Sequence, residues 1–330
     1  MAKTVLVVGG AGYIGSHTAM ALEKAGYDVV VLDNLSTGHG DFMRFGRGVV
    51  GDLADTALLK KLFDQNDFAG VMHFAAHAYV GESVFEPAKY YRNNVANTLN
   101  LLEVMKEYGV GTFIFSSTCA TYGDPLELPI TEEHPQNPVN PYGRTKLAVE
   151  WMLRDFDRAY GMKHCILRYF NAAGAAPAAM DAGIGERHDP ETHLIPLVLR
   201  AAQDPGKTVT IFGTDYDTRD GTCIRDYVHV CDLADAHILG MERLLAGEKS
   251  AVYNLGNGEG YSVREVIDCA RTVTGLAIRA EEAARREGDP PALVGDAAKA
   301  VRELGWKPRF AALENMVRTA WDWEKRELDR

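Results

Sequence analysis

The sequence predicts an α/β protein with a doubly wound parallel sheet and a smaller, discontinuous lobe in its C-terminal half. Three observations support this prediction. Apolar strands alternate with helical stretches up to residue 171, which is typical of a parallel sheet covered by helices on both faces. The first apolar run, Val5 to Val8, leads directly into a glycine-rich turn and then into a helix-forming stretch. Beyond residue 171 the elements become short and irregular, which indicates a second lobe.

The alternating pattern places the elements in order. Strands are expected at residues 5–8, 27–32, 48–52, 70–75, 112–117 and 165–169, and helices at 16–25, 56–65, 90–108 and 142–160. Five prolines between residues 125 and 141 predict an irregular connection, and the Ala- and Gly-rich residues 172–188 predict a loop. Residues 228–240 and 252–255 are regular enough to return to the main sheet. We therefore expect one domain formed by 1–172 with roughly 224–257, and a lobe formed by 173–223 and 258–330, with ligands in the cleft between them.

The glycine-rich turn indicates a dinucleotide cofactor on a Rossmann sheet. Gly9, Gly12 and Gly15 can provide the tight turn, the close approach of backbone N–H groups to a pyrophosphate, and the packing of helix on strand. The second strand ends on Asp33, at the spacing expected for the carboxylate that binds the adenosine ribose hydroxyls. Because no Lys or Arg follows Asp33 before Arg44, the sequence favours NAD over NADP. A glycine turn in a cofactor-free α/β domain is the simpler alternative.

Charge and cysteine content narrow the class of protein. A net charge of −11 argues against nucleic acid or an anionic membrane as the main partner. The cysteines are odd in number and scattered, without metal-ligand spacing, so we expect reduced thiols, a cytoplasmic location and no metal; they are Cys119, Cys165, Cys223, Cys231 and Cys269. The chain begins almost at once with a strand and contains no long apolar run, so we expect neither a signal peptide nor a membrane span.

A candidate catalytic group follows the fifth strand. Tyr142 and Lys146 are four residues apart on an expected helix, so both side chains lie on one face. An ammonium beside the phenol would lower the pKa of the tyrosine, as a base that removes an alcohol proton requires. The strand itself ends with Ser116, Ser117 and Thr118 at the carboxyl edge of the sheet, where open α/β folds bind ligands. The simpler alternative is a polar strand end that caps the next segment.

In these residues the chain resembles the extended short-chain dehydrogenase/reductase superfamily, and within it the UDP-glucose (UDP-galactose) 4-epimerases. The resemblance runs from about Lys3 to beyond Trp306. It is carried by short blocks in a fixed order: Gly9 to His17, Leu32 to Leu35, Gly51 to Leu53, His73 to Ala76, Val80 to Ser83, Tyr90 to Asn94, Ser116 to Thr118, Pro141 to Lys146, Arg168 to Asn171, Arg225 to Val230 and Arg286 to Asp289.

The resemblance implies a role for particular residues. Tyr142 would be the acid/base, Lys146 its partner on the nicotinamide ribose, and Thr118 would stand where many members have serine. NAD would be bound by the glycine turn and by Tyr13, Ile14, Asp33, Asn34, Asp52, Leu53, Phe74, Ala75, Ala76, Asn93 and Phe170. The UDP-sugar would be bound in the second lobe and at its border by Asn171, His193, Leu194, Thr210, Ile211, Phe212, Arg225, Arg286, Asp289 and Leu293, together with Thr118.

The implied reaction is a transient oxidation at sugar C4, after which the 4-keto sugar turns its other face and is reduced again. A homodimer is also implied, through the helices at 98–108 and 149–160. Two departures leave the sugar open, because Ala78 stands where some epimerases have lysine and His193 stands where others have asparagine. Both occur in a branch that includes epimerases of pentose nucleotide-sugars.

Two further alternatives remain at this point. A sugar-nucleotide 4,6-dehydratase would carry an Asp-Glu pair directly after its catalytic threonine, where this chain has Cys119 and Ala120. A non-catalytic NAD-binding regulator would not need both Tyr142 and Lys146.

Overall fold

A seven-stranded parallel sheet forms the centre of the computed structural model, which describes residues 2–180, 183–286 and 288–328. From one edge to the other the strands are β3 (Arg47–Val50), β2 (Asp28–Asp33), β1 (Thr4–Val8), β4 (Phe68–His73), β5 (Thr112–Thr118), β6 (Lys163–Tyr169) and β11 (Ala251–Leu255). The chain order reverses between β1 and β4, where Val8 pairs with both Leu32 and His73. Doubly wound sheets bind ligands at the carboxyl ends of the strands at such a reversal.

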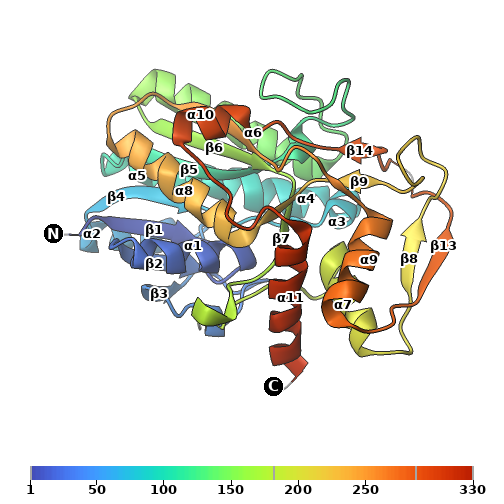
Figure 1. Ribbon diagram of the computed structural model, residues 1–330. Coiled ribbons are helices and arrows are strands. Elements are labelled where there is room, and N and C mark those ends of the chain that lie inside the picture. Colours follow the sequence, from blue (N-terminus) through green and yellow to red (C-terminus); the bar gives the residue numbers. More distant parts are fainter. Residues whose placement is uncertain (1, 181–182, 287, 329–330) are drawn as a thin grey trace.

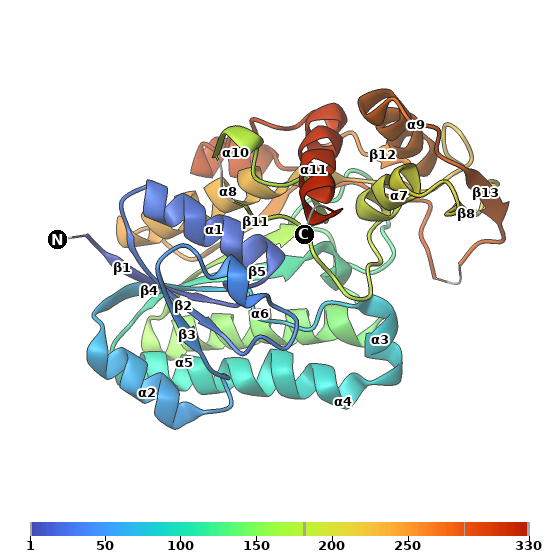
Figure 2. The ribbon, with the colours of Figure 1, turned by 90° about the horizontal axis from the view of Figure 1, so that it is seen from below.

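Helices cover both faces of this sheet (Figure 2). One face carries α1 (Tyr13–Lys24), α8 (Val230–Leu245) and α10 (Ala298–Leu304), and the other carries α2 (Thr56–Gln65), α5 (Asn97–Glu107) and α6 (Pro141–Tyr160). Val5 and Val7 belong to the core on the first face, and Leu6 and Val8 to the core on the second. Because both faces are buried, the strand is an unbroken apolar run rather than an alternating one.

A second lobe lies beside the carboxyl edge of the sheet (Figure 1). It contains α7 (Leu194–Gln203), α9 (Val263–Thr274), α11 (Leu313–Leu328) and the parallel pair β8 (Val209–Phe212) and β13 (Ala280–Ala283). Shorter strands join it to the sheet: β7 (Asn171–Ala173) with β10 (Tyr227–His229), and β9 (Ile224–Arg225) with β12 (Tyr261–Ser262) and β14 (Ala292–Leu293). The lobe has a core of its own, with Val198, Val266 and Met316 fully buried.

Some elements differ from those expected. The helix expected at 90–108 begins earlier, as α3 (Val80–Phe85) and α4 (Pro87–Tyr90), and continues through a π-helical turn at Tyr91–Ala96 into α5. Only β11 of the two returning segments joins the main sheet, because residues 230–245 form α8 on its face. The described part of the expected loop at 172–188 contains the end of β7 and a short turn at Ala178–Met180, and residues 181–182 lie outside the described residues, as does Glu287.

A buried ion pair connects α6 to β6 under the site. The side chains of Arg168 and Glu150 are 2% and 0% exposed. Arg168 donates from Nε and Nη2 to the two carboxylate oxygens of Glu150, at 2.9 and 2.6 Å. Ser117, near the end of β5, donates to Glu150 Oε1 at 2.7 Å. This hydrogen bond connects β5 to the ion pair as well. Burial raises the pKa of Glu150, but the hydrogen bonds and charge of Arg168 outweigh it and hold that pKa below its usual value.

No helix among the described residues is long and apolar enough to span a membrane, and the five cysteines are free thiols.

Candidate active site

A cavity of about 690 Å³ opens at the carboxyl ends of β1, β2, β4 and β5, where the sheet order reverses. A second cavity of about 680 Å³ lies toward the other lobe. The two have several lining residues in common, including Asn171, His193, Arg225, Arg286 and Asp289. The geometry therefore offers one long, two-part site between sheet and lobe.

The glycine turn at the base of the first cavity requires its glycines for steric reasons. Gly9 has a φ of +81°, and a Cβ there would lie 2.5 Å from the backbone nitrogen of Ala75. A Cβ at Gly15 would lie 2.2 Å from the carbonyl oxygen of Gly9, so α1 can approach β1 only without a side chain there. Gly12 is less crowded and lines the cavity. The turn thus leaves open backbone at the N-terminus of α1, an arrangement that binds phosphates in proteins.

Asp33 ends β2 at the far side of this cavity. Its carboxylate accepts hydrogen bonds from the backbone N–H groups of Ala11 at 2.9 Å and Leu35 at 2.8 Å. Burial raises the pKa of Asp33, while those two hydrogen bonds act in the opposite direction. Asn34 donates to Asp52 at 2.6 Å on the same rim. Backbone N–H groups thus hold both oxygens of Asp33 at the rim of the cavity, and neither these contacts nor the one between Asn34 and Asp52 adds a cation that would attract a ribose phosphate.

All the residues expected at the cofactor line this cavity except Lys146. They are Gly9, Gly12, Tyr13, Ile14, Gly15, Asp33, Asn34, Asp52, Leu53, Phe74, Ala75, Ala76, Asn93, Tyr142 and Phe170. The hydroxyl of Tyr13 also has a structural contact, since it donates to the carbonyl of Gly174 at 2.5 Å.

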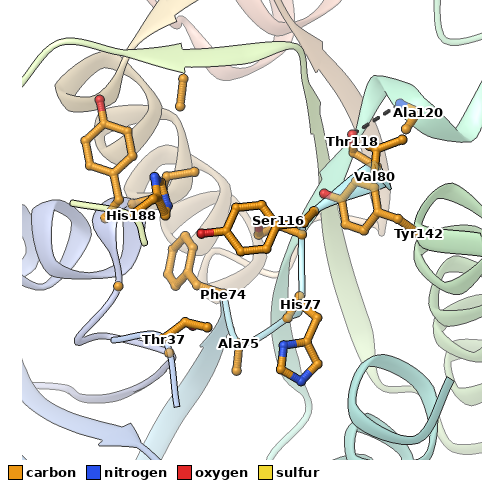
Figure 3. Close-up of a pocket in the computed structure, with 18 of the residues that line it drawn as sticks. Thr37, Phe74, Ala75, His77, Val80, Ser116, Thr118, Ala120, Tyr142 and His188 are labelled. Atoms are coloured by element: carbon orange, nitrogen blue, oxygen red, sulfur yellow. Dashed lines mark hydrogen bonds between the residues drawn. The ribbon is translucent and has the colours of Figure 1, made fainter. Parts of the chain in front are cut away.

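Tyr142 and Thr118 meet at one wall of the cavity (Figure 3). Tyr142 lies in the first turn of α6, and Thr118 is the last residue of β5 and accepts from the N–H of Ala120 at 3.1 Å. Burial raises the pKa of Tyr142 to about 12, and the hydrogen bond with Thr118 is the interaction that acts in the lowering direction.

Lys146, the expected partner of Tyr142, makes its hydrogen bond to the end of β5. Its ammonium donates to the carbonyl of Ser116 at 2.7 Å and lies 4.9 Å from the Phe115 ring centroid and 6.0 Å from that of Tyr142. It is buried, and burial lowers its pKa to about 7. The ammonium thus lies over the face of the Tyr142 ring, and the interaction that lowers the pKa of Tyr142 is the hydrogen bond with Thr118.

Two arginines line both cavities and share one carboxylate. Arg225 donates to Asp289 at 3.2 Å, and Arg286 donates to the other oxygen of Asp289 at 3.1 Å. Arg225 is held further by the carbonyls of Ile224 and Pro290, whereas the side chain of Arg286 is 61% exposed and lies 4.8 Å from the Phe212 ring centroid. Asp289 thus brings together two cations that can bind a diphosphate.

The remaining residues expected at the substrate divide into two groups. Leu194, Thr210 and Phe212 line the second cavity, and Leu293 lines the first. Ile211 is a correction: its side chain is 3% exposed and packs in the core of the second lobe. Successive side chains of a β-strand point to opposite faces. Because Ile211 points into the core, its neighbours Thr210 and Phe212 point to the other side, toward the cavity.

Sequence reasoning missed Glu186 and His188, which also line the first cavity. His188 lies across the pocket from Thr118 and Tyr142 (Figure 3). A signal was available, because Glu186, His188, Glu191 and His193 follow one another within eight residues. Asn94, in the π-helical turn, has no role assigned from the sequence, yet it accepts from the N–H of His77 at 2.9 Å and donates to Thr145 at 3.1 Å. π-helical turns of this kind are frequent at functional sites.

A Rossmann sheet with a glycine turn and a Tyr-x-x-x-Lys pair at one cavity is typical of dinucleotide-dependent enzymes. The model of the NAD dependent epimerase/dehydratase family matches residues 5–256, and the chain belongs to this family.

Known proteins are similar along nearly the whole chain. The UDP-glucose 4-epimerase of Halalkalibacterium halodurans is 51% identical over 321 residues, which are 97% of this chain and 95% of that protein. The crystal structure of UDP-glucose 4-epimerase from Brucella ovis in complex with NAD has a TM-score of 0.94 at 51% identity, and the match covers 97% of this chain and 98% of that chain. That of UDP-glucose-4-epimerase from Stenotrophomonas maltophila, with bound NAD and formylated UDP-arabinopyranose, has a TM-score of 0.95 at 35% identity and covers 100% of this chain and 99% of that one.

Proposed function

We propose that this protein is an NAD-dependent 4-epimerase that interconverts UDP-glucose and UDP-galactose through a 4-keto sugar. The observation that carries the proposal is the position of Tyr142 and Thr118 at a cavity that continues to Arg225 and Arg286. The curated relative named above, 51% identical over 97% of this chain, supports the same activity. We propose residues 1–172 with about 224–257 as the part that binds NAD, and residues 173–223 with 258–330 as the part that binds the nucleotide-sugar.

The residues that line the first cavity fit the chemistry of NAD. Its glycine turn exposes backbone at the N-terminus of α1 for a pyrophosphate. Asp33 places a carboxylate at the end of β2, where ribose hydroxyls would donate to it. When bound, NAD⁺ supplies a hydride acceptor for sugar C4 and a positive charge that lowers the pKa of a nearby phenol.

The protein's own residues account for the proton and for orientation. Tyr142 takes the proton of the sugar 4-hydroxyl and returns it once the 4-keto sugar has presented its other face. Thr118 holds the phenol and the reacting oxygen by hydrogen bonds. Lys146 fixes the end of β5 through the Ser116 carbonyl, and we propose that it also donates to the nicotinamide ribose once NAD is bound.

Arg225, Arg286 and Asp289 are proposed to bind the UDP part. The two guanidinium groups pair with the diphosphate, and Asp289 keeps them together and accepts from a ribose hydroxyl. Asn171, His193, Leu194, Thr210 and Phe212 form the surrounding walls.

The direct test is turnover of the UDP-sugar itself. Purified protein is incubated with UDP-galactose or UDP-glucose, and the two epimers are separated and quantified. We expect each sugar to approach the same equilibrium mixture with no net accumulation of NADH. Release of a 4-keto-6-deoxy sugar would show a dehydratase, and bound NAD without any turnover would show a non-catalytic regulator. UDP-xylose is included as the second candidate, because one structural relative holds a UDP-pentose derivative.

Leu293 offers a prediction on sugar size. It stands in β14, lines the same cavity as Thr118, and packs against the small cluster of Tyr122, Ile130 and Phe170. A branched side chain here is expected to crowd an N-acetyl group at sugar C2, at a cost of about 1–3 kcal/mol or roughly 5- to 150-fold. Leu293→Ser should therefore raise kcat/KM for UDP-N-acetylgalactosamine relative to UDP-galactose. An unchanged ratio would mean that Leu293 does not limit the pocket at this position.

A homodimer is also part of the proposal, as is action in the cytoplasm. The outer faces of α5 and α6 expose Leu99, Trp151 and Tyr160, with 36%, 56% and 53% of their surfaces accessible. Two such faces can form a helix bundle across a two-fold axis. Light scattering during gel filtration should give twice the mass of the 36.2 kDa chain, and Trp151→Glu should shift that mass to the monomer. A monomeric wild type would exclude the dimer.

A further inference from the structure

Four potential metal ligands converge in the segment that leads into α7. Glu186, His188, Glu191 and His193 each direct one ligand atom to the same place, and these atoms lie within 4.8 Å of one another. Of the described residues, only this group gathers three or more histidine, cysteine or carboxylate ligands so closely. The proposed reaction uses His193 only as a wall of the sugar site and gives the other three no role.

The spacing of the ligand atoms fits a metal ion. His193 Nδ1 lies 2.9 Å from Glu186 Oε1 and 2.9 Å from Glu191 Oε1. His188 Nδ1 lies 3.2 Å from Glu186 Oε1 and 3.7 Å from Glu191 Oε2. Ligands placed about 2.1 Å from a tetrahedral zinc ion are ~3.4 Å apart, which falls between these separations.

Burial and unused lone pairs are the second observation. The side chains of Glu186 and Glu191 are 7% and 2% exposed, so two carboxylates are buried beside each other and require positive charge. His188 Nδ1 and Glu191 Oε2 are buried and make no hydrogen bond of acceptable geometry to any described residue, although both lie close to the other ligands. The nearest guanidinium, of Arg200, is 3.8 Å from Glu191 and is also engaged with Glu324. Buried polar atoms that lack hydrogen bonds and point to a common centre are available to coordinate a cation.

Hydrogen bonds from surrounding groups hold the segment that carries the four ligands. Glu191 Oε1 accepts from the N–H groups of Thr192 and His193, both at 2.8 Å. Trp323 donates to the carbonyl of Glu186 at 2.9 Å. Such outer contacts orient ligands and are a regular part of metal sites.

We propose that Glu186, His188, Glu191 and His193 bind one zinc ion. Two imidazole nitrogens and two carboxylate oxygens form a borderline donor set that suits zinc better than the all-oxygen ligands that magnesium and calcium prefer. Four protein ligands close the coordination shell, so the ion is structural. It fixes one wall of the cofactor cavity, because the His188 ring packs edge-on against Tyr13 and Tyr79, with centroids 6.3 and 6.1 Å away.

The test measures metal in the full-length protein and does not depend on turnover. The protein is stripped with a chelator, titrated with zinc in a competition assay, and analysed for metal content by mass spectrometry. We expect one equivalent of zinc per chain and a higher unfolding midpoint with the ion than without it. Cobalt substituted at the site should show the absorption of a four-coordinate ion.

Two variants assign the ion to these ligands. Glu191→Gln and His188→Gln should each weaken zinc binding by ~100-fold or more, since a lost ligand costs at least as much as a lost outer contact. His164→Gln is the matched control, because His164 is a buried histidine on β6 outside the cluster and should leave the stoichiometry at one. The proposal is overturned if the wild type binds no zinc, which would mean that protonated histidines balance the carboxylates. It is equally overturned if both variants, shown folded by circular dichroism, bind zinc as the wild type does.

Discussion

Replacing Tyr142 by phenylalanine is expected to reduce epimerisation of UDP-galactose by about 10²–10⁴-fold. The phenol is the proposed proton carrier and meets the Thr118 hydroxyl at the wall of the cavity. Phenylalanine keeps the half-buried ring and removes only the hydroxyl, so the fold and bound NAD should remain. The measurement is kcat at saturating UDP-galactose, with NAD content determined on the same sample.

Tyr216→Phe is the control for this experiment. Tyr216 is a buried tyrosine that belongs to the second lobe and does not line either cavity. Its loss of a hydroxyl should leave turnover close to that of the wild type. If Tyr142→Phe retained activity within threefold of the wild type, another group would have to carry the proton.

The second large effect is expected on stability, from Glu150→Ala. This change leaves the Arg168 guanidinium buried without its carboxylate, and such a loss costs about 3–5 kcal/mol. Ser117 and Gln136 lose their acceptor at the same time. Urea unfolding followed by circular dichroism should show the midpoint shifted to lower concentration.

Glu107→Ala tests whether burial of the ion pair is the reason for the large loss of stability expected from Glu150→Ala. Glu107 pairs with Lys60 at 2.8 Å, but both side chains are about half exposed, and an exposed pair contributes only about 0–1 kcal/mol. The loss of stability caused by Glu107→Ala should therefore be small compared with that caused by Glu150→Ala. Combining Glu150→Leu with Arg168→Met should recover part of the stability, because no unpaired charge remains. Equal losses in the two alanine variants would show that the buried pair does not stabilise the fold more than the surface pair does.

Local patterns determined much of the architecture. The central strands and the helices α1, α2 and α6 follow from apolar runs and helical periodicity, because both signals arise between residues close in the chain. The glycine turn and Asp33 belong to one strand–turn–helix–strand unit, so their place at one cavity could be predicted without the rest of the molecule. The family was recognisable from ordered blocks, and the family model confirms it.

Only the tertiary structure decided where individual side chains point. The sequence places Lys146 on the same helical face as Tyr142, yet its ammonium turns to the carbonyl of Ser116 because β5 lies beneath it. Ile211 was grouped with its neighbours on the strand but faces the core, since α7 and α9 cover that side. The cluster of Glu186, His188, Glu191 and His193 has no helical or strand period, so its convergence results from how the irregular segment folds against the sheet and α11. Periodicity records which face of a regular element is buried, whereas the direction of a side chain in a loop or at a strand end depends on partners far away in the chain.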